Sequence, residues 1–211
     1  MTDQSTRLPA VDAHPDTRQR ILVTARDLIH ARSYTDVGVA EICDRAGVRK
    51  GSFYHFFPSK RELTLAVLEL NLAEAKERLL DQAFDPRIPP LERFERLADL
   101  TYELHRERAA LAGQVLGCPV GNLATELATR DEAIRAATAR AFERLQALMR
   151  ESLAEAARDG SLPAVDVEAT AQAMVAYFEG VLMLAKTAND VNVVRRLLPT
   201  LAQIRIPKAS N

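Results

Sequence analysis

The chain has 211 residues, 47% of them hydrophobic, so it is long enough to bury a core as one large domain or as a small domain joined to a larger one. Its net charge is −1, and neither of its two cysteines, Cys43 and Cys118, has a histidine at metal-ligand spacing, so we expect no disulfide framework, no metal and no cofactor. The first residues lack the apolar core of a signal peptide, and no later stretch reaches the roughly 18 apolar residues of a membrane span, which predicts a cytoplasmic protein without a membrane partner.

The N-terminal part of the sequence predicts an arm followed by a helix. Residues 1–15 have no helical apolar pattern, and we expect them to form a flexible arm. Asp16 and Gln19 are placed as in a capping box, which predicts a helix over 17–32. Its apolar stripe consists of Ile21, Ala25, Leu28 and Ile29.

Two short helices and a long one are expected next. Apolar residues at i, i+3, i+4 and i+7 predict a helix over 39–46, and Gly47 then allows a sharp turn. A second short helix follows over 49–55. An S-x-x-E capping box at 59–62 begins a long helix that continues to about Phe84.

The rest of the chain is rich in Ala, Leu, Glu and Arg and also predicts helices. They are expected over 91–109, 119–128, 130–158, 167–187 and 190–205. Thr129 with Glu132 is expected to cap the helix over 130–158, and Pro199 is expected to kink the last one. The sequence therefore predicts an all-α protein of about nine helices.

Basic residues are concentrated around the second short helix. Residues 1–63 contain ten Lys and Arg against eight Asp and Glu, whereas 64–211 contain 18 against 21. The window 45–61 holds five basic residues and no acid. Two short helices joined by a glycine turn and packed on a preceding helix form a helix-turn-helix, whose second helix can enter the major groove of DNA.

The string VGVAEICDRAGVRKGSFYHFFPSKREL at 37–63 resembles the DNA-binding segment of the TetR (tetracycline-repressor/AcrR) family of transcriptional regulators, and YFEGVLMLAK at 177–186 resembles its C-terminal part. The resemblance implies a helix-turn-helix DNA-binding domain over 16–63 and a larger ligand-binding and dimerisation domain over 64–211. It also implies a homodimer, a palindromic double-stranded DNA operator and a small-molecule effector. In such a family the regulator is commonly a repressor that its effector releases.

The second short helix is expected to contact DNA. Gly51 allows close backbone approach, Tyr54 offers a phenol to a phosphate, and Lys60 adds charge to the free N–H groups that begin the long helix. The side chains expected to reach base edges or phosphates are Arg49, Lys50, Ser52 and His55. The family usually has glycine in place of Ser33 and a hydroxyl residue within 37–38, so the cap of the first short helix is in question.

The helices predicted over 167–187 and 190–205 carry apolar residues on more than one face, so a single subunit could hardly bury all of them. We expect them to pair with their twofold mates in a dimer, as the family resemblance implies. The expected interface residues are Ala169, Ala173, Ala176, Gly180, Val194, Leu198 and Leu201. The alternative is that these stripes are internal core.

A small-molecule pocket is expected among the helices of the larger domain. Its candidate residues supply an apolar wall with few polar tips: Tyr102, His105, Cys118, Phe142, Met149, Met174, Tyr177 and Phe178. Each of them is also compatible with an ordinary core position.

Cys118 belongs to the string GCPVGNLATEL at 117–127, which resembles a segment in branches of the family that include electrophile-responsive repressors. With Pro119 at the first helical position, Cys118 would be the N-cap, where the helix dipole stabilises a thiolate. A sensor thiol is therefore one hypothesis. A small structural residue packed among Leu116, Val120 and Leu123 is the other.

Two other classes of protein compete with a DNA-binding regulator. An enzyme would use His105, Cys118 or carboxylates of the helical domain, but no nucleophile motif, phosphate loop or metal constellation supports it, and we expect no enzymatic activity. An interaction protein would instead present its basic helix to an acidic partner. A ligand-responsive activator is also compatible with the sequence.

Overall fold

The structure is a computed structural model and describes residues 16–208. The predicted flexible arm, 1–15, lies outside the described residues. Within 16–208 the chain forms nine continuous helical segments, which confirms the all-α prediction. They are α1 (Thr17–Ala31), α2 (Val39–Ala46), α3 (Lys50–Phe56), α4 (Lys60–Ala75) with its continuation, α6 (Glu92–Ala112), α7 (Pro119–Leu127), α8 (Glu132–Arg158), α9 (Val167–Ala188) and α10 (Asn192–Leu197) with its continuation.

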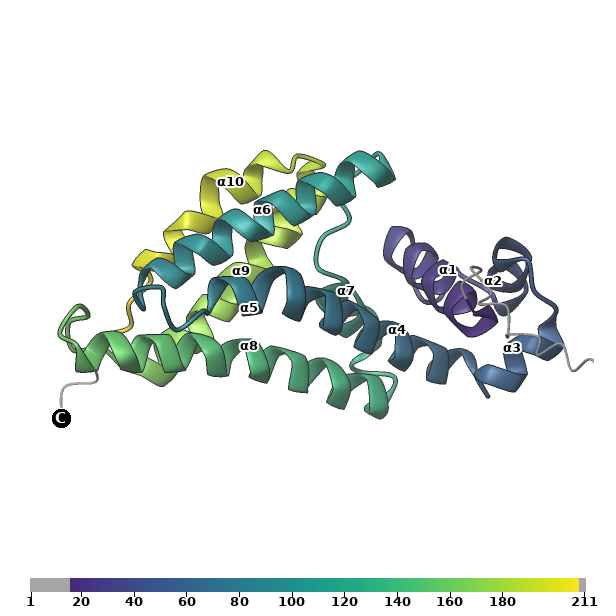
Figure 1. Ribbon diagram of the computed structural model, residues 1–211, viewed down its shortest axis with the longest axis horizontal. Helices are drawn as coiled ribbons and strands as arrows, with labels where there is room; N and C mark the ends of the chain where they lie inside the picture. The colour runs from purple at the N-terminus through teal and green to yellow at the C-terminus, as the bar shows by residue number, and fades with distance from the viewer. Residues whose placement is uncertain (1–15, 209–211) are drawn as a thin grey trace, which may run out of the picture.

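The long helix that begins at α4 does not keep one hydrogen-bonding pattern. After Ala75 it passes through a π-helical segment, Lys76–Leu80, and then returns to α-helix in α5 (Asp81–Ala83). Figure 1 shows α4 leading from α1, α2 and α3 at one end of the molecule into the larger helical body. This helix therefore joins the two parts of the protein.

Side-chain caps set several helix starts. The Ser59 hydroxyl accepts the Glu62 N–H at 3.2 Å, which confirms Ser59 as the N-cap of α4, while the Glu62 carboxylate pairs with Arg61. The prediction for α8 was wrong, because Asp131 and not Thr129 caps it, accepting the Ile134 N–H at 3.1 Å. A carboxylate is the stronger partner at the positive end of a helix.

The first of two hydrophobic cores lies beneath the N-terminal helices. Phe53 of α3 is completely buried in it. The same core continues into α7 and the first half of α8, through Leu123, Leu127 and Ile134. The N-terminal unit therefore packs on part of the larger domain, in addition to being joined to it by α4.

The second core fills the body between α6, α8, α9 and α10. Its largest fully buried side chains include Phe94, Leu97, Met149, Met174 and Leu182. In Figure 1, α6 and α10 lie side by side, and α8 runs along the opposite edge of the body.

The last helical segment belongs to this second core. After α10 the chain tightens into a 3-10 helix, Leu198–Gln203, at the point where Pro199 was expected to disturb the helix. Val194, Leu198 and Leu201 are completely buried against the body. Their assignment to a dimer interface was therefore wrong, because a side chain that its own subunit fully covers has no surface left for a partner.

Among the described helices, none combines the length and apolar composition that a membrane crossing requires.

Candidate nucleic-acid interface and cavity

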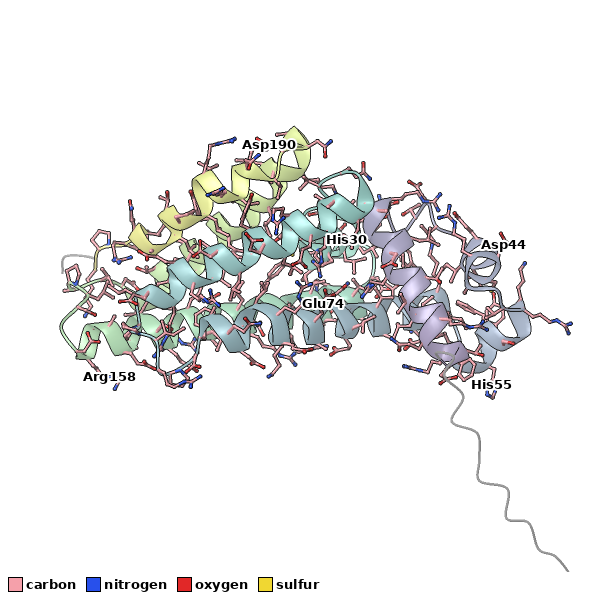
Figure 2. All side chains as sticks on the ribbon, turned by 45° about the horizontal axis from the view of Figure 1, so that its top comes forward. His30, Asp44, His55, Glu74, Arg158 and Asp190 are labelled. Atoms are coloured by element: carbon pink, nitrogen blue, oxygen red, sulfur yellow. The ribbon has the colours of Figure 1, made fainter. Side chains whose placement is uncertain are left out.

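One face of α3 is exposed, polar and basic. Arg49 is the N-cap of α3, and Lys50, Gly51, Tyr54 and His55 are exposed. Ser52 is half-buried. Figure 2 shows His55 at one end of the molecule and Arg158 at the other, so α3 is presented far from the body.

Burial on the opposite face of α3 orients this surface. Phe53 is 0% exposed and Phe57 3% exposed, and their rings lie 6.1 Å apart in the first core. The turn before α3 is possible because Gly47 adopts a left-handed conformation with φ of 64°. At Gly51 an added Cβ would meet no protein atom within 4 Å, so packing within the chain does not require glycine there.

The start of α2 departs from the usual capped form. Its N-cap is Gly38, which makes no side-chain hydrogen bond. Val37, which stands near the position of the expected hydroxyl residue, is completely buried in the first core. A side-chain hydroxyl is therefore absent from this cap within the described structure.

Lys60 is engaged by the protein itself. Its Nζ donates to the carbonyl of Tyr34 and lies 4.0 Å from the centre of the Tyr34 ring. Burial lowers the pKa of Lys60, against the opposing effects of Glu126 and Asp36. The ammonium that was expected to meet phosphate thus already has partners at the turn between α1 and α2.

Glu126, near the C-terminal end of α7, holds the same turn from the other side. Its Oε2 accepts the Tyr34 N–H at 2.9 Å, and its Oε1 accepts the Thr35 N–H at 2.8 Å and the Thr35 hydroxyl at 2.6 Å. Burial raises the pKa of Glu126, but the hydrogen bonds from Thr35 and Tyr34 outweigh it, so the pKa lies below its usual value. The carboxylate is therefore stabilised in its charged form.

Further polar contacts connect α1 to the body. The ring Nε2 of His30 makes a 2.9 Å hydrogen bond with the carbonyl of Gly117, and burial is the main reason that the pKa of His30 falls to about 4. Glu74 on α4 forms ion pairs with Arg108 at 3.1 Å and with Arg26 at 3.7 Å. Figure 2 shows His30 and Glu74 near this junction.

A cavity of about 730 Å³ opens at the same junction, between α1, α4, α7 and α9. Its volume falls in the range typical of small-molecule sites, about 300–1,000 Å³. The polar side chains of its wall include His30, Asn71, Cys118, Asn122, Glu179 and Lys186. Asn71 is 4% exposed and contributes its side chain to this wall.

Cys118 is the N-cap of α7, as predicted, and its Sγ accepts the Gly121 N–H at 3.3 Å. The surroundings of the thiol favour its neutral form and so the structural alternative. Burial raises the pKa of Cys118 well above its usual value, and the carboxyl of Glu179 raises it further, while the Gly121 N–H opposes them only in part. Burial likewise raises the pKa of Glu179.

The remaining predicted pocket residues do not converge on this cavity. Met149 and Met174 are completely buried in the second core, and Phe178 is 6% exposed there. The Tyr177 hydroxyl donates to the carbonyl of Leu197 at 2.8 Å, on the outside of the body. For these four residues the structure supports the core or packing alternative.

Three others also lie elsewhere. Tyr102 lies beneath the guanidinium of Arg195, at the edge of a separate hollow. His105 is 5% exposed, and burial lowers its pKa to about 3. Phe142 packs against both cores. Of the eight predicted residues, Cys118 alone is among those that line the junction cavity within the described chain.

Sequence reasoning missed the polar wall of the cavity. Asn71 follows Val67 by four residues on a buried helix face, and Glu179 interrupts the apolar run of α9. An isolated polar residue within such a run is a usable signal, because a buried polar group needs a partner.

The outer face of α9 carries a stripe of small and apolar residues, which we call the α9 stripe. Its members are Ala169, Ala173, Ala176, Gly180, Met183 and Leu184. Met183 is 61% and Leu184 is 50% exposed. The predicted interface residues of this helix are half-buried or exposed, unlike those of the last segment, and Ala176, Gly180 and Met183 of the stripe also line the junction cavity.

Comparison with known proteins gives matches along most of the chain. Residues 21–67 match the family described as "Bacterial regulatory proteins, tetR family", and residues 90–201 match "Tetracyclin repressor-like, C-terminal domain". An uncharacterized HTH-type transcriptional regulator in the lacX 3'region of Lactococcus lactis is 32% identical, over 85% of this chain and 88% of the relative. The HTH-type transcriptional repressor DhaR of a Mycobacterium species is 24% identical, over 94% of this chain and 97% of the relative.

The fold also has solved counterparts. The crystal structure of the regulatory protein TetR from Rhodobacter sphaeroides has a TM-score of 0.78 and 31% identity to this chain. That similarity covers 90% of this chain and 99% of the Rhodobacter protein. Of the segments that match the family models, residues 21–67 contain α3 and residues 90–201 contain α7 and α9.

Proposed function

This chain belongs to the TetR family of bacterial transcriptional regulators, and from that premise we propose that it is a homodimeric repressor that binds a palindromic operator and releases it when a small molecule occupies the junction cavity. Members of the family bind DNA operators and dimerise. The proposal also names the residues that contact DNA, the partner subunit and the effector, and it states that the effector releases the operator.

The DNA contact is assigned to α3, and the observation that carries it is the division of that helix into a buried and an exposed face. Phe53 fixes the helix in the core, while Arg49 and Lys50 are exposed beside an open Gly51. The cationic side chains of Arg49 and Lys50 can bind phosphates and the edges of guanine bases, and Gly51, which has no side chain, lets the DNA backbone approach closely. Ser52, Tyr54 and His55 complete the reading surface.

The dimer is assigned to the α9 stripe. Its small residues allow close approach of a second helix, and Met183 and Leu184 supply apolar area that water otherwise covers. A twofold dimer presents two copies of α3, which suits half-sites about one helical turn, roughly 34 Å, apart.

The effector site is assigned to the junction cavity. Its wall includes α1 of the N-terminal unit as well as α7 and α9 of the body, so a bound molecule touches both parts at once. The amide of Asn71 in the cavity wall carries both a hydrogen-bond donor and an acceptor that a ligand can use. Release follows if the ligand prefers a conformer in which the two reading helices are wrongly spaced. The name of the relative DhaR supports a repressor.

Selection of duplexes from a random DNA pool tests the proposal. We expect the wild-type protein to enrich a palindrome, and Arg49→Ala and Lys50→Ala to lower its operator affinity by about tenfold each. Arg158→Ala is the matched control, because this exposed arginine lies at the opposite end of the molecule. Equal binding of all duplexes at low salt by the wild-type protein, or equal losses for Arg158→Ala and Lys50→Ala, would contradict it.

A further inference from the structure

The wall of the junction cavity contains three side chains that are always or usually cationic at neutral pH: Arg26, Arg32 and Lys186. Arg26 pairs with Glu74, and Arg32 pairs with Glu41. Lys186 differs from both arginines, because it forms no ion pair with a carboxylate of the described part of the chain. Its positive charge is therefore the one in this wall that an anionic ligand can neutralise most readily.

Lys186 is held in place at the edge of the cavity, although its side chain is exposed. Its Nζ donates to Oδ1 of Asn122 at 3.0 Å, and Nδ2 of Asn122 donates to the carbonyl of Leu116 at 2.9 Å. The stem of the lysine packs on Gly117, where an added Cβ would lie 3.1 Å from the Lys186 Cδ. An ammonium has more N–H donors than the one that Asn122 uses, so the others remain for a ligand.

The carboxyl groups of the cavity wall, those of Glu126 and Glu179, compensate this charge only in part. The Glu126 carboxylate accepts hydrogen bonds at 2.6–2.9 Å from the turn between α1 and α2, and these bonds occupy both of its oxygens. Burial raises the pKa of Glu179, against a hydrogen bond with Cys118 that lowers it, and so favours the neutral carboxyl. Lys186 is therefore left without an acidic partner in its own subunit, as far as the structure describes the chain.

His30, which lines the same cavity, is affected by the same charges. Burial is the main reason that its pKa falls to about 4, and its hydrogen bond with the Gly117 carbonyl opposes the fall. The positive charges of Arg108, Lys186 and Arg26 lower the pKa further. Cations therefore dominate the electrostatic field at this histidine, and a negative charge bound beside it would be stabilised.

Part of the cavity wall on α1, α4 and α7 is apolar, through the side chains of Ile29, Val67 and Leu123. These side chains suit a ligand with a compact apolar group, which gains free energy when it leaves water. The polar end of such a ligand meets one lysine without an acidic partner, which matches a single negative charge. A phosphate monoester carries about −1.5 to −2 at neutral pH and offers three acceptor oxygens, more than this lysine can serve alone.

We infer that the junction cavity binds a small carboxylic acid, with its carboxylate paired to the ammonium of Lys186 and its apolar group against Ile29, Val67 and Leu123. The inference rests on the proposed function, because it names the chemical class of the effector that is assigned to this cavity. The acid binds as its anion, since a carboxyl group in water loses its proton at about pH 4. The hydrogen bond from Asn122 keeps the lysine at the position where it meets the ligand.

Pairs of an acid and its primary amide test the inference, because the two molecules have nearly the same shape and differ in charge. Benzoate with benzamide, and hexanoate with hexanamide, are titrated into the full-length protein by isothermal titration calorimetry. We expect the acid of each pair to bind about tenfold more tightly, the effect of one charged hydrogen-bonded pair. Lys186→Gln should remove this preference, whereas Lys186→Arg should keep it. Lys76→Gln is the matched control, because this exposed lysine lies outside the junction cavity and pairs with Asp81.

Equal affinities of acid and amide for the wild-type protein would overturn the inference, as would a preference that survives Lys186→Gln or a series in which no acid binds. Tighter binding of phenyl phosphate than of benzoate would overturn the choice of a carboxylate. Operator release separates this inference from the proposed function. An acid that binds through Lys186 but leaves the operator bound supports the inference and removes the effector part of the proposed function. Release by neutral molecules alone keeps the proposed function and overturns the inference.

Discussion

Replacement of Met183 and Leu184 by aspartate is expected to dissociate the dimer. Both side chains belong to the α9 stripe and are well exposed in the single subunit, at 61% and 50%. Full burial of such a side chain contributes about 1.5–3 kcal/mol, and roughly half of that area is still available to a partner. Each side chain then contributes about 1 kcal/mol, and four of them meet in a twofold dimer. Their loss is about 4 kcal/mol.

That free energy corresponds to an increase of about 10³-fold in the dimer dissociation constant, since about 1.4 kcal/mol is tenfold. The introduced carboxylates add to the effect, because a charge in an interface must lose its water. Analytical ultracentrifugation over a range of concentrations measures the constant directly. Operator affinity should fall in parallel, because two reading helices no longer bind as one unit.

Leu111→Asp is the matched control for this experiment. Leu111 is 90% exposed near the end of α6, outside the α9 stripe. If it dissociates the dimer as strongly as the double aspartate variant, or if the double variant stays dimeric at nanomolar concentration, then the stripe is not the interface.

Three further predictions concern the N-terminal unit and Cys118. Lys60→Met should weaken operator binding yet keep the wild-type salt dependence in fluorescence anisotropy titrations, because its ammonium is bound to Tyr34; a flatter salt slope would instead show a phosphate contact. Glu179→Gln should speed the alkylation of Cys118 by iodoacetamide at neutral pH, because the nearby carboxyl contributes to the raised pKa of the thiol. Peptide mass mapping measures the rate, and an unchanged rate would contradict the effect of Glu179. Gly47→Ala should destabilise the fold by about 1–2 kcal/mol in chemical denaturation, since φ is 64°, and no change in midpoint would refute this.

Local signals in the sequence predicted the helices well. The Ser59 cap and the apolar spacing of 39–46 depend on residues within one or two turns, and the structure confirms both. The start of α8 was misassigned because Thr129 and Asp131 are both acceptable caps. Helix ends of this kind are decided by small free-energy differences.

Distant partners decide what the local sequence could not predict. Lys60 is expected at a phosphate, and this stays a prediction, but its partner Tyr34 lies 26 residues away in the chain. The pKa of Cys118 is set largely by burial and by Glu179 of another helix, which opposes the favourable effect of the helix start. Leu198 lies on an apolar stripe that could face either its own core or a partner, and sequence periodicity does not distinguish these two.

The π-helical segment at Lys76–Leu80 affects the orientation of the N-terminal unit relative to the larger domain. Before it, Val67 and Leu68 belong to the first core, whereas Leu79 within it and Ala83 after it belong to the second. Each residue of a regular helix advances the side chains by about 100° around the axis, whereas a π turn accommodates an additional residue within one revolution. This single turn therefore sets the angle, around the axis of the helix 60–83, between the face buried in the first core and the face buried in the second. One spare residue there sets the angle at which each subunit holds out its reading helix.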